Sequence, residues 1–137
     1  MITVRPGTLA DLAPIAQIQA SSPEGAQWPV HEYLQYDLLV AEYGSSAAGF
    51  GVARRLAEDE SELLNLAVDP QFRRRGVGRR LAAALLARHS GSLWLEVRES
   101  NIVACKFYKS LGFQERGYRP DYYRNPSEGA IVMKVHS

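Results

Sequence analysis

The sequence predicts an α/β domain of the layered α+β kind, with a mixed central β-sheet of about seven strands flanked by about four helices. Two observations lead to this fold class. Short runs of branched and aromatic residues alternate with stretches of helical periodicity in the order β-α-α-β-β-β-α-β-α-β-β. The 137 residues are 46% hydrophobic and 23% charged, which suits one globular core. We therefore expect residues 1–137 to form a single domain.

The first half of the chain predicts two helices among four strands. Thr8 is a candidate helix N-cap with Asp11 three residues later, and Pro29 suits the first position of a short second helix. A turn that begins at Gly44 separates two of the strands. The expected elements are a strand at 2–5, helices at 8–21 and 29–35, and strands at 38–43, 47–55 and 62–68.

The second half predicts two helices that alternate with three strands. Leu81, Leu85 and Leu86 give the longer helix an apolar face, and Gly112 suits the C-cap of the shorter one. Each strand–helix–strand unit is expected to cross over in the right-handed sense. The expected elements are a helix at 77–89, a strand at 92–97, a helix at 101–111, and strands at 113–118 and 130–135.

Composition argues against several classes of protein. A net charge of +1 is far from the basic balance of a nucleic-acid binder, so no nucleic-acid partner is expected. No apolar run is long enough to span a bilayer, and the first residues lack a secretion-signal pattern, so no membrane partner is expected. The single cysteine, Cys105, allows neither an intrachain disulfide nor a cysteine-based metal site. We expect a cytoplasmic protein without a metal, with His31, His89 and His136 at the surface.

The most informative segment joins the strand at 62–68 to the helix at 77–89. Residues 68–78 read Val-Asp-Pro-Gln-Phe-Arg-Arg-Arg-Gly-Val-Gly. A helix start has unpaired backbone N–H groups and a partial positive charge, and glycines let a phosphate approach the backbone. The segment therefore predicts a pyrophosphate site, although it lacks the Gly-Lys-Ser/Thr of a P-loop. By itself it is equally consistent with a tight turn followed by a solvated arginine run.

These residues resemble the GNAT acetyltransferase family. Arg73-x-x-Gly76-x-Gly78 matches its acetyl-CoA motif, and residues 93–101 and 107–113 are similar to its downstream half. Residues 121–123 and 129–133 resemble the end of its ribosomal-protein alanine N-acetyltransferases, the RimI group. The resemblance covers about residues 60–135 and implies the GNAT fold, with acetyl-CoA as co-substrate and no metal.

The resemblance also implies where acetyl-CoA binds. Its diphosphate is expected on backbone amides of the turn and helix start, and its pantetheine arm along the preceding strand, as in strand addition. Asn101 is expected either to bond the pantetheine or simply to cap its helix, and the two roles are compatible. The implied acetyl-CoA-binding residues are Leu66, Ala67, Val68, Arg73, Arg74, Arg75, Gly76, Val77, Gly78, Arg79, Asn101 and Tyr108.

Acetyl transfer needs a neutral amine, a polarised thioester carbonyl and a proton donor for the departing thiolate. At pH 7, neutralising an α-amine costs about 1 kcal/mol and neutralising a lysine about 4.6 kcal/mol. A weak base such as a carboxylate therefore suffices to deprotonate an N-terminal amine. The resemblance assigns the base to Glu96 and the proton donor to Tyr108, with a backbone N–H near Val68 holding the oxyanion. The alternatives are a carboxylate paired with Arg98 and a packed aromatic ring.

Direct transfer in a ternary complex is expected, and an acetyl-enzyme at Cys105 is the alternative route. The leading acceptor is a protein N-terminus like that of ribosomal protein S18. A small-molecule amine or a protein lysine is the second hypothesis, and a non-catalytic acetyl-CoA-binding protein is the third. A monomer or weak homodimer is expected. The candidate acceptor-binding residues are Trp28, Tyr33, Glu42 and Tyr122.

Overall fold

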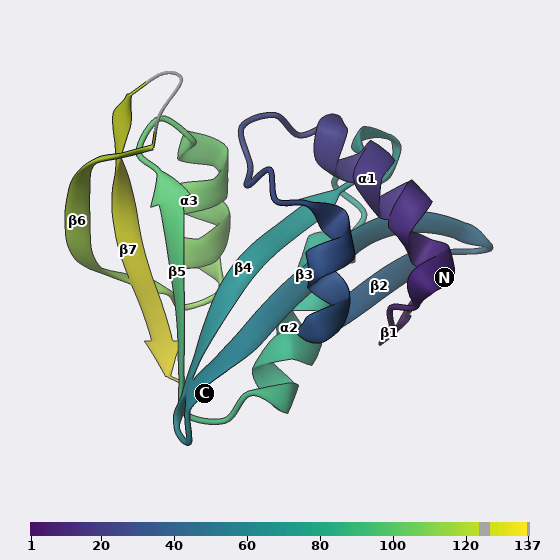
Figure 1. The fold of residues 1–137 in the computed structure, drawn as a ribbon, viewed down its shortest axis with the longest axis horizontal. Coiled ribbons are helices and arrows are strands. Elements are labelled where there is room, and N and C mark those ends of the chain that lie inside the picture. The colour runs from purple at the N-terminus through teal and green to yellow at the C-terminus, as the bar shows by residue number, and fades with distance from the viewer. Residues whose placement is uncertain (124–126, 137) are drawn as a thin grey trace.

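The computed structural model describes residues 1–123 and 127–136, and within them a seven-stranded mixed sheet carries helices on both faces (Figure 1). The strand order is β1-β2-β3-β4-β5-β7-β6. The strands are β1 (Ile2–Pro6), β2 (Asp37–Tyr43), β3 (Ser46–Ala57), β4 (Glu60–Val68), β5 (Ser92–Arg98), β6 (Gln114–Tyr123) and β7 (Glu128–His136). The α-helices are α1 (Leu12–Ala20), α2 (Val77–Arg88) and α3 (Ile102–Ser110), and the 3-10 helices are η1 (Leu9–Asp11), η2 (Val30–Gln35) and η3 (Pro70–Phe72).

The predicted order of elements is confirmed, with differences at their ends. The first helix begins as η1 before α1, and the Asp11 carboxylate accepts a hydrogen bond from the Thr8 N–H at 2.8 Å, as expected for this helix start. The second helix is the 3-10 helix η2. Strands β6 and β7 extend beyond the expected residues 113–118 and 130–135. Since β6 is exposed along almost all its length, its sequence lacks the apolar alternation that marks a strand.

Strands β4 and β5 form the only parallel pair among the described strands, and they are joined over a short stretch. Glu60–Glu62 of β4 pair with Ser92–Trp94 of β5, after which the two strands separate. Figure 1 shows them side by side at one end and diverging toward the other. The last strand, β7, inserts between β5 and β6 and runs antiparallel to both. The second half of β4 therefore has an edge without a strand partner.

Each face of the sheet has its own hydrophobic core. Helices α2 and α3 cover one face, where Leu81, Leu85 and Tyr108 pack in one cluster with residues of β2, β3 and β5. Helices α1 and η2 cover the other face, where Ile15 and Tyr33 pack in a second cluster with residues of β2, β3 and β4. Helices therefore pack on both faces of the sheet, in which β4 and β5 are paired over only a short stretch. Within the described parts of the chain, no helix is long and apolar enough to cross a membrane.

His89 is buried, so the prediction that it lies at the surface is wrong. It directly follows α2 and is 5% exposed. Its Nε2 lies 2.8 Å from Asp37 Oδ2, and its Nδ1 lies 2.9 Å from Ser61 Oγ. Arg88 donates to the same carboxylate at 2.8 Å. These partners compensate the burial of the imidazole and tie the end of α2 to the sheet.

Candidate active site

A cavity of about 880 Å³ opens where β4 and β5 separate. Its lining comes from β4, the segment that leads into α2, the first turn of α2, α3, and the end of α1 with the loop that follows it. Every residue that the sequence predicted to bind acetyl-CoA lines this cavity except Arg75. Segments that are far apart in the chain thus meet around one hollow of the size that a small-molecule co-substrate requires.

The turn before α2 has the geometry of an anion site. Arg74 and Gly76 both adopt left-handed backbone conformations, with φ of 65° and 84°. The Arg80 N–H bonds the Gly76 carbonyl at 3.0 Å, so the N–H groups of residues 77–79 precede the helical hydrogen-bond ladder. Such N–H groups at the positive end of a helix bind phosphate oxygens well. A left-handed arginine is strained, and strain of this kind is concentrated at ligand-binding turns.

The arginine side chains around this turn differ in where they point. Arg73 donates from Nη2 to Ser22 Oγ at 3.1 Å and lines the cavity. Arg75 instead donates to the Tyr43 hydroxyl at 3.3 Å, with its guanidinium 5.1 Å from the centre of that ring. The Arg75 side chain therefore contacts Tyr43 and does not line the cavity, whereas the expectation for this residue concerned its backbone amide. Its backbone amide, adjacent to Gly76, is still part of the turn.

The free edge of β4 offers backbone groups to an extended ligand. The Asp69 N–H donates to the Ala48 carbonyl at 2.8 Å, which makes the neighbouring Val68–Gly49 pair a non-hydrogen-bonded one. The N–H and C=O of Val68 therefore point away from β3, and those of Leu66 do so by alternation. Two of these groups already have a side-chain partner, because the Leu66 N–H donates to Asn65 Oδ1 at 2.9 Å and Arg73 Nε donates to the Val68 carbonyl at 3.4 Å. The outward-facing edge is the arrangement that strand addition by a pantetheine arm needs, and it fits the residues that the sequence implied.

Asn101 caps α3 at the opposite wall of the cavity. Its Oδ1 accepts a hydrogen bond from the Ala104 N–H at 3.2 Å, so the predicted N-cap is confirmed. Its side chain also lines the cavity, which leaves the predicted contact with the pantetheine open to it. Both roles are sterically compatible because capping uses one oxygen of an amide that also carries two N–H donors.

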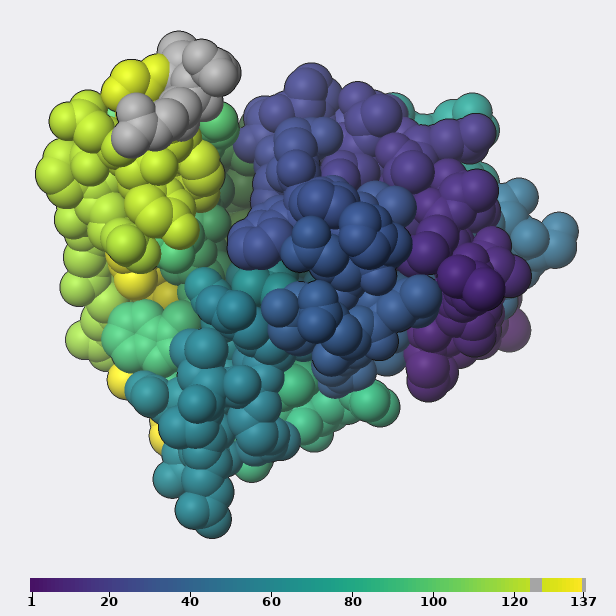
Figure 2. Space-filling model, viewed as in Figure 1, coloured from purple at the N-terminus to yellow at the C-terminus, as the bar shows by residue number. Residues whose placement is uncertain are grey.

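A second, smaller cavity of about 80 Å³ adjoins the first. The two share several lining residues, including Tyr108, and the smaller one adds Glu96 and Tyr123. On its other side it is bounded by Gly25 and Ala26, which belong to the α1–η2 loop (residues 21–29). Figure 2 shows the surface hollowed between the dark blue part of the chain that includes this loop and the yellow-green β6 and β7.

Tyr108 stands at the junction of the two cavities. Its ring packs edge-on against Phe107 and Phe113, with ring centres 5.3 Å and 5.4 Å apart. Burial raises the pKa of the Tyr108 phenol well above its usual value. The phenol therefore keeps its proton at neutral pH, as a proton donor to a departing thiolate must.

Glu96 is held by residues of β6. Arg119 donates from Nη1 to Glu96 Oε2 at 2.8 Å, and its guanidinium lies 4.3 Å from the centre of the Tyr122 ring. Burial, followed by the charge of Glu96 and a hydrogen bond to it, raises the pKa of the Tyr122 phenol. Arg98, the alternative partner expected from the sequence, donates from Nη1 to Glu128 Oε1 at 2.9 Å. The Glu96 side chain is 16% exposed, so its carboxylate is oriented yet within reach of solvent.

Cys105 is unsuited to nucleophilic attack. It is buried within α3 among the core residues, and burial raises the pKa of its thiol. A thiol needs a lowered pKa to act as a nucleophile near pH 7. Among residues 1–123 and 127–136, no group of three or more His, Cys, Asp or Glu side chains could hold a metal ion.

Comparison with known proteins identifies the family. The sequence matches the Acetyltransferase (GNAT) family over residues 10–113. The chain belongs to the GNAT acetyltransferase family. It is 35% identical to a [ribosomal protein bS18]-alanine N-acetyltransferase of Haemophilus ducreyi, over 93% of this chain and 86% of the relative. It is 41% identical to the protein of the same name from Escherichia coli K12, over 75% of this chain and 71% of the relative.

Solved structures agree with this membership. The ribosomal-protein-S18-alanine N-acetyltransferase from Escherichia coli superposes with a TM-score of 0.83 at 31% identity, covering 98% of this chain and 93% of that one. Ard1 from Thermoplasma volcanium superposes with a TM-score of 0.88 at 30% identity, covering 98% and 96%. The protein is thus an acetyl-CoA-dependent N-acetyltransferase with the seven-stranded GNAT fold.

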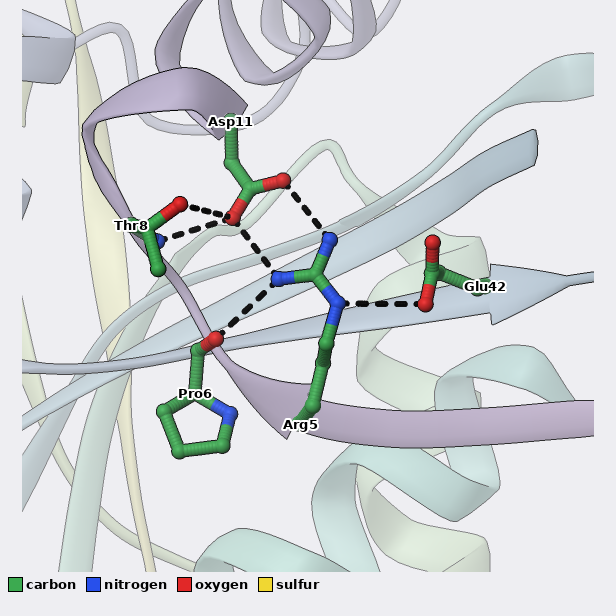
Figure 3. A network of polar contacts seen from close by, with 5 residues as sticks. All are labelled: Arg5, Pro6, Thr8, Asp11 and Glu42. Atoms are coloured by element: carbon green, nitrogen blue, oxygen red, sulfur yellow. Dashed lines mark hydrogen bonds and ion pairs between the residues drawn. The ribbon is translucent and has the colours of Figure 1, made fainter. Parts of the chain in front are cut away.

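Two of the predicted acceptor-binding residues lie away from both cavities of this GNAT enzyme. Tyr33 is 1% exposed and donates from its hydroxyl to Gln19 Oε1 at 2.6 Å, so it belongs to the core beneath the α1–η2 loop. Glu42 accepts from Arg5 Nε at 3.1 Å, in a network with Asp11 at the far edge of the sheet (Figure 3). The prediction of these two residues at the acceptor wall is therefore corrected, because other partners hold their polar groups.

The other two candidates lie closer to the site. Trp28 is in the α1–η2 loop, where its carbonyl accepts from Gln19 Nε2 at 2.7 Å, but its 39%-exposed side chain lies outside both cavity linings. Tyr122 is beside Glu96, as described above. The structure therefore brings Tyr122 to the region of Glu96, whereas Trp28 lines neither cavity and its carbonyl is held by Gln19.

Sequence reasoning missed several residues that line both cavities. Glu24, Gly25 and Ala26 come from a loop whose sequence carries only a turn signal. Asn65 could have been found, because it is the polar residue within the apolar run Leu-Leu-Asn-Leu-Ala-Val of β4. A polar side chain at a buried strand position needs hydrogen-bond partners, which indicates a specific role.

Proposed function

We propose that this enzyme transfers the acetyl group of acetyl-CoA to the α-amine of a protein N-terminus resembling that of ribosomal protein S18. The names of the relatives with 35% and 41% identity support this acceptor. The structural observation that carries the proposal is the pair of joined cavities, which share Tyr108 at their junction and have Glu96 in the smaller one. Donor and acceptor can then approach from opposite sides of the splayed strands.

The larger cavity binds the donor. The amides around Gly76 and Gly78 and the positive end of α2 bind the diphosphate, and Arg73 and Arg79 add positive charge. The edge of β4 pairs with the pantetheine arm through the Leu66 carbonyl and the Val68 N–H. Acetyl-CoA supplies an activated thioester, whose carbonyl a β4 backbone N–H polarises.

The smaller cavity receives the amine, and the reaction is a direct transfer. Glu96 accepts the proton of the incoming ammonium through a water molecule, because its carboxylate is oriented by Arg119 and partly exposed. The neutral amine attacks the thioester carbonyl, and the C–S bond breaks. The Tyr108 hydroxyl gives its proton to the departing sulfur, and the phenolate takes back the proton that the nitrogen loses as the amide forms. In this proposal residues 1–137 form one catalytic domain that acts in the cytoplasm as a monomer or weak homodimer.

The test is CoA release in the presence of acetyl-CoA and matched acceptors. One peptide has the S18 N-terminus with a free α-amine, a second has the same sequence with a blocked α-amine and free lysines, and a third arm is a set of small amines. Turnover confined to the first peptide is expected. Turnover of the blocked peptide or of a small amine, without turnover of the first peptide, would overturn the proposed acceptor.

A further inference from the structure

A buried polar network lies under the acceptor side of the two cavities, and the mechanism above does not use it. At its centre is Asn65 of β4, which is 8% exposed and lines both cavities. Its Oδ1 accepts a hydrogen bond from the Leu66 N–H at 2.9 Å, on the free edge of the strand. Its Nδ2 donates to the Ala26 carbonyl of the α1–η2 loop at 3.1 Å. One side chain thus joins the donor edge to the acceptor loop.

Two further side chains hold Asn65 in this orientation. Its Nδ2 lies 3.1 Å from the Tyr33 hydroxyl and 3.2 Å from Gln19 Oε1. Gln19 in turn donates from Nε2 to the Trp28 carbonyl at 2.7 Å, so the loop is held at a second point. The orientation of the Asn65 amide follows from its partners, because the Leu66 N–H needs an acceptor and the Ala26 carbonyl needs a donor.

The fold alone does not need this network. Asn65 occupies a strand whose neighbouring residues pack in apolar clusters, and a buried polar group is tolerated only when its hydrogen bonds are satisfied. An apolar side chain there would fill the space without that requirement. What the network provides is a fixed distance between the edge of β4 and residues 24–26 of the loop, which line both cavities.

We infer that Asn65 is a positioning residue, which sets acceptor binding by fixing the α1–η2 loop against the edge of β4. The inference rests on the proposed function, because it assigns the loop to the acceptor. Without the donor groups of Asn65, the loop loses its bond at Ala26 and the wall of the smaller cavity moves. Near the turn that binds the diphosphate, the loop has a separate hydrogen bond, from Arg73 to Ser22 Oγ, which does not involve Asn65, so the amides around Gly76 keep their geometry.

Two variants separate the two halves of the Asn65 side chain, and a third changes Gln19. Asn65→Ala removes both halves. Asn65→Asp keeps an acceptor for the Leu66 N–H and removes the donor to the Ala26 carbonyl. Gln19→Met removes the donor to the Trp28 carbonyl and the Oε1 acceptor that Asn65 and Tyr33 use, and it keeps the bonds of Asn65 to Ala26 and Leu66. The matched control is Ser61→Ala, which deletes a fully buried hydrogen-bonding side chain of the same strand that lines neither cavity.

The experiment combines steady-state kinetics with hydrogen–deuterium exchange of the acetyl-CoA-bound proteins. In Asn65→Asp and Gln19→Met we expect the KM of the acceptor peptide to rise about tenfold, while the Kd of acetyl-CoA stays within about twofold. Loop amides within residues 22–27 should exchange faster in all three variants. Ser61→Ala should lower the melting temperature and leave both constants and loop exchange as in the wild type.

Unchanged loop exchange in Asn65→Ala would overturn the inference. It would also be overturned if faster loop exchange left the acceptor KM unchanged, or if acceptor KM and acetyl-CoA Kd rose together in Asn65→Asp. Failure of the proposed function looks different, because the wild-type enzyme would then release no CoA with any α-amine peptide. In that case exchange decides whether Asn65 holds the loop, and the acceptor that the wild type does use replaces the peptide in the KM comparison.

Discussion

At the scale of single residues, the sequence predicts the catalytic side chains of the site but not the partners that hold them. Glu96 and Tyr108 stand in motifs, so their types and spacing could be predicted, and the structure adds that they share one cavity. The ion pair between Glu96 and Arg119 could not be predicted, because these residues are 23 positions apart and meet only across β7. The actual positions of Tyr33 and Glu42, away from the acceptor wall, could not be predicted, because the sequence does not show that Gln19 and Arg5 are their hydrogen-bond partners.

Replacing Tyr108 with Phe removes the proton donor and keeps the packed ring. We expect kcat to fall by a factor of about 100 or more, which is the usual contribution of general acid catalysis. The Kd of acetyl-CoA should stay within about twofold, because the contacts of the ring with Phe107 and Phe113 are retained. Single-turnover kinetics and calorimetry measure the two quantities. An active Tyr108→Phe enzyme would remove Tyr108 from the mechanism.

Replacing Glu96 with Gln should give a pH-dependent defect. Below the α-amine pKa of about 7.7–8 the acceptor arrives protonated and needs a base, whereas at pH 9 most of it is already neutral. The loss of kcat/KM in Glu96→Gln should therefore be about tenfold or more at pH 7 and should shrink as the pH rises to 9. Initial rates across this range test it. An equal loss at every pH would mean that Glu96 orients the acceptor and does not accept its proton.

At the scale of elements, the start of α2 was predictable and the ends of the sheet were not. The run from Arg73 to Gly78 marks a strand-to-helix turn because glycine tolerates conformations that other residues avoid. Strand β6 has no comparable signal, since nearly all of it is exposed and its hairpin pairing with β7 has an irregular register. The position of the α1–η2 loop beside β4 was not predictable either. It depends on hydrogen bonds to Asn65 and Gln19, which are side chains of other elements.

Gly76→Ala tests the turn, and Gly44→Ala is its matched control. Both glycines have left-handed backbones, with φ of 84° and 65°, and at both an added Cβ would meet nothing within 4 Å. Each substitution should therefore lower stability by a similar amount, about 1 kcal/mol. Only Gly76→Ala should weaken acetyl-CoA binding, by about fivefold or more, because the strained turn aims its amides differently. Equal affinities in the two variants would argue against this turn as the diphosphate site.

At the scale of the whole molecule, the order of elements was predictable and the order of strands in the sheet was not. Local periodicity gives each helix and strand, but the insertion of β7 between β5 and β6 depends on contacts between distant segments. That insertion completes the second half of the sheet and leaves β4 and β5 free to splay. The hydrophobic core under α2 and α3 contains residues from β2 to β5 and from β7, so it keeps the two halves together where the cavities form.

The network around Arg5 makes the stability of the whole molecule depend on pH (Figure 3). Hydrogen bonds from Arg5, opposed by burial, lower the pKa of the Asp11 carboxyl from 3.8 to about 2. Because the folded-state pKa is depressed, the stabilisation is present above about pH 4 and is lost as the pH falls toward 2. Asp11→Asn should lower the free energy of unfolding by about 1–2 kcal/mol at pH 7, allowing for the exposure of Arg5.

Urea unfolding of the wild type and Asp11→Asn at several pH values measures this difference. It should be largest near neutral pH and shrink toward zero near pH 2, where the wild-type carboxyl also becomes neutral. A difference that stays constant down to pH 2 would show that Asp11 stabilises the start of the first helix through hydrogen bonds alone, without its charge.

The central claim is that the acetyl group goes to an α-amine. Its most direct test is tandem mass spectrometry of one peptide that carries both a free S18-like N-terminus and internal lysines, after incubation with the enzyme and acetyl-CoA. The account predicts a single added acetyl group, found in the fragment ions that contain the first residue. Acetylation found on the lysines, with the N-terminus unmodified, would contradict it.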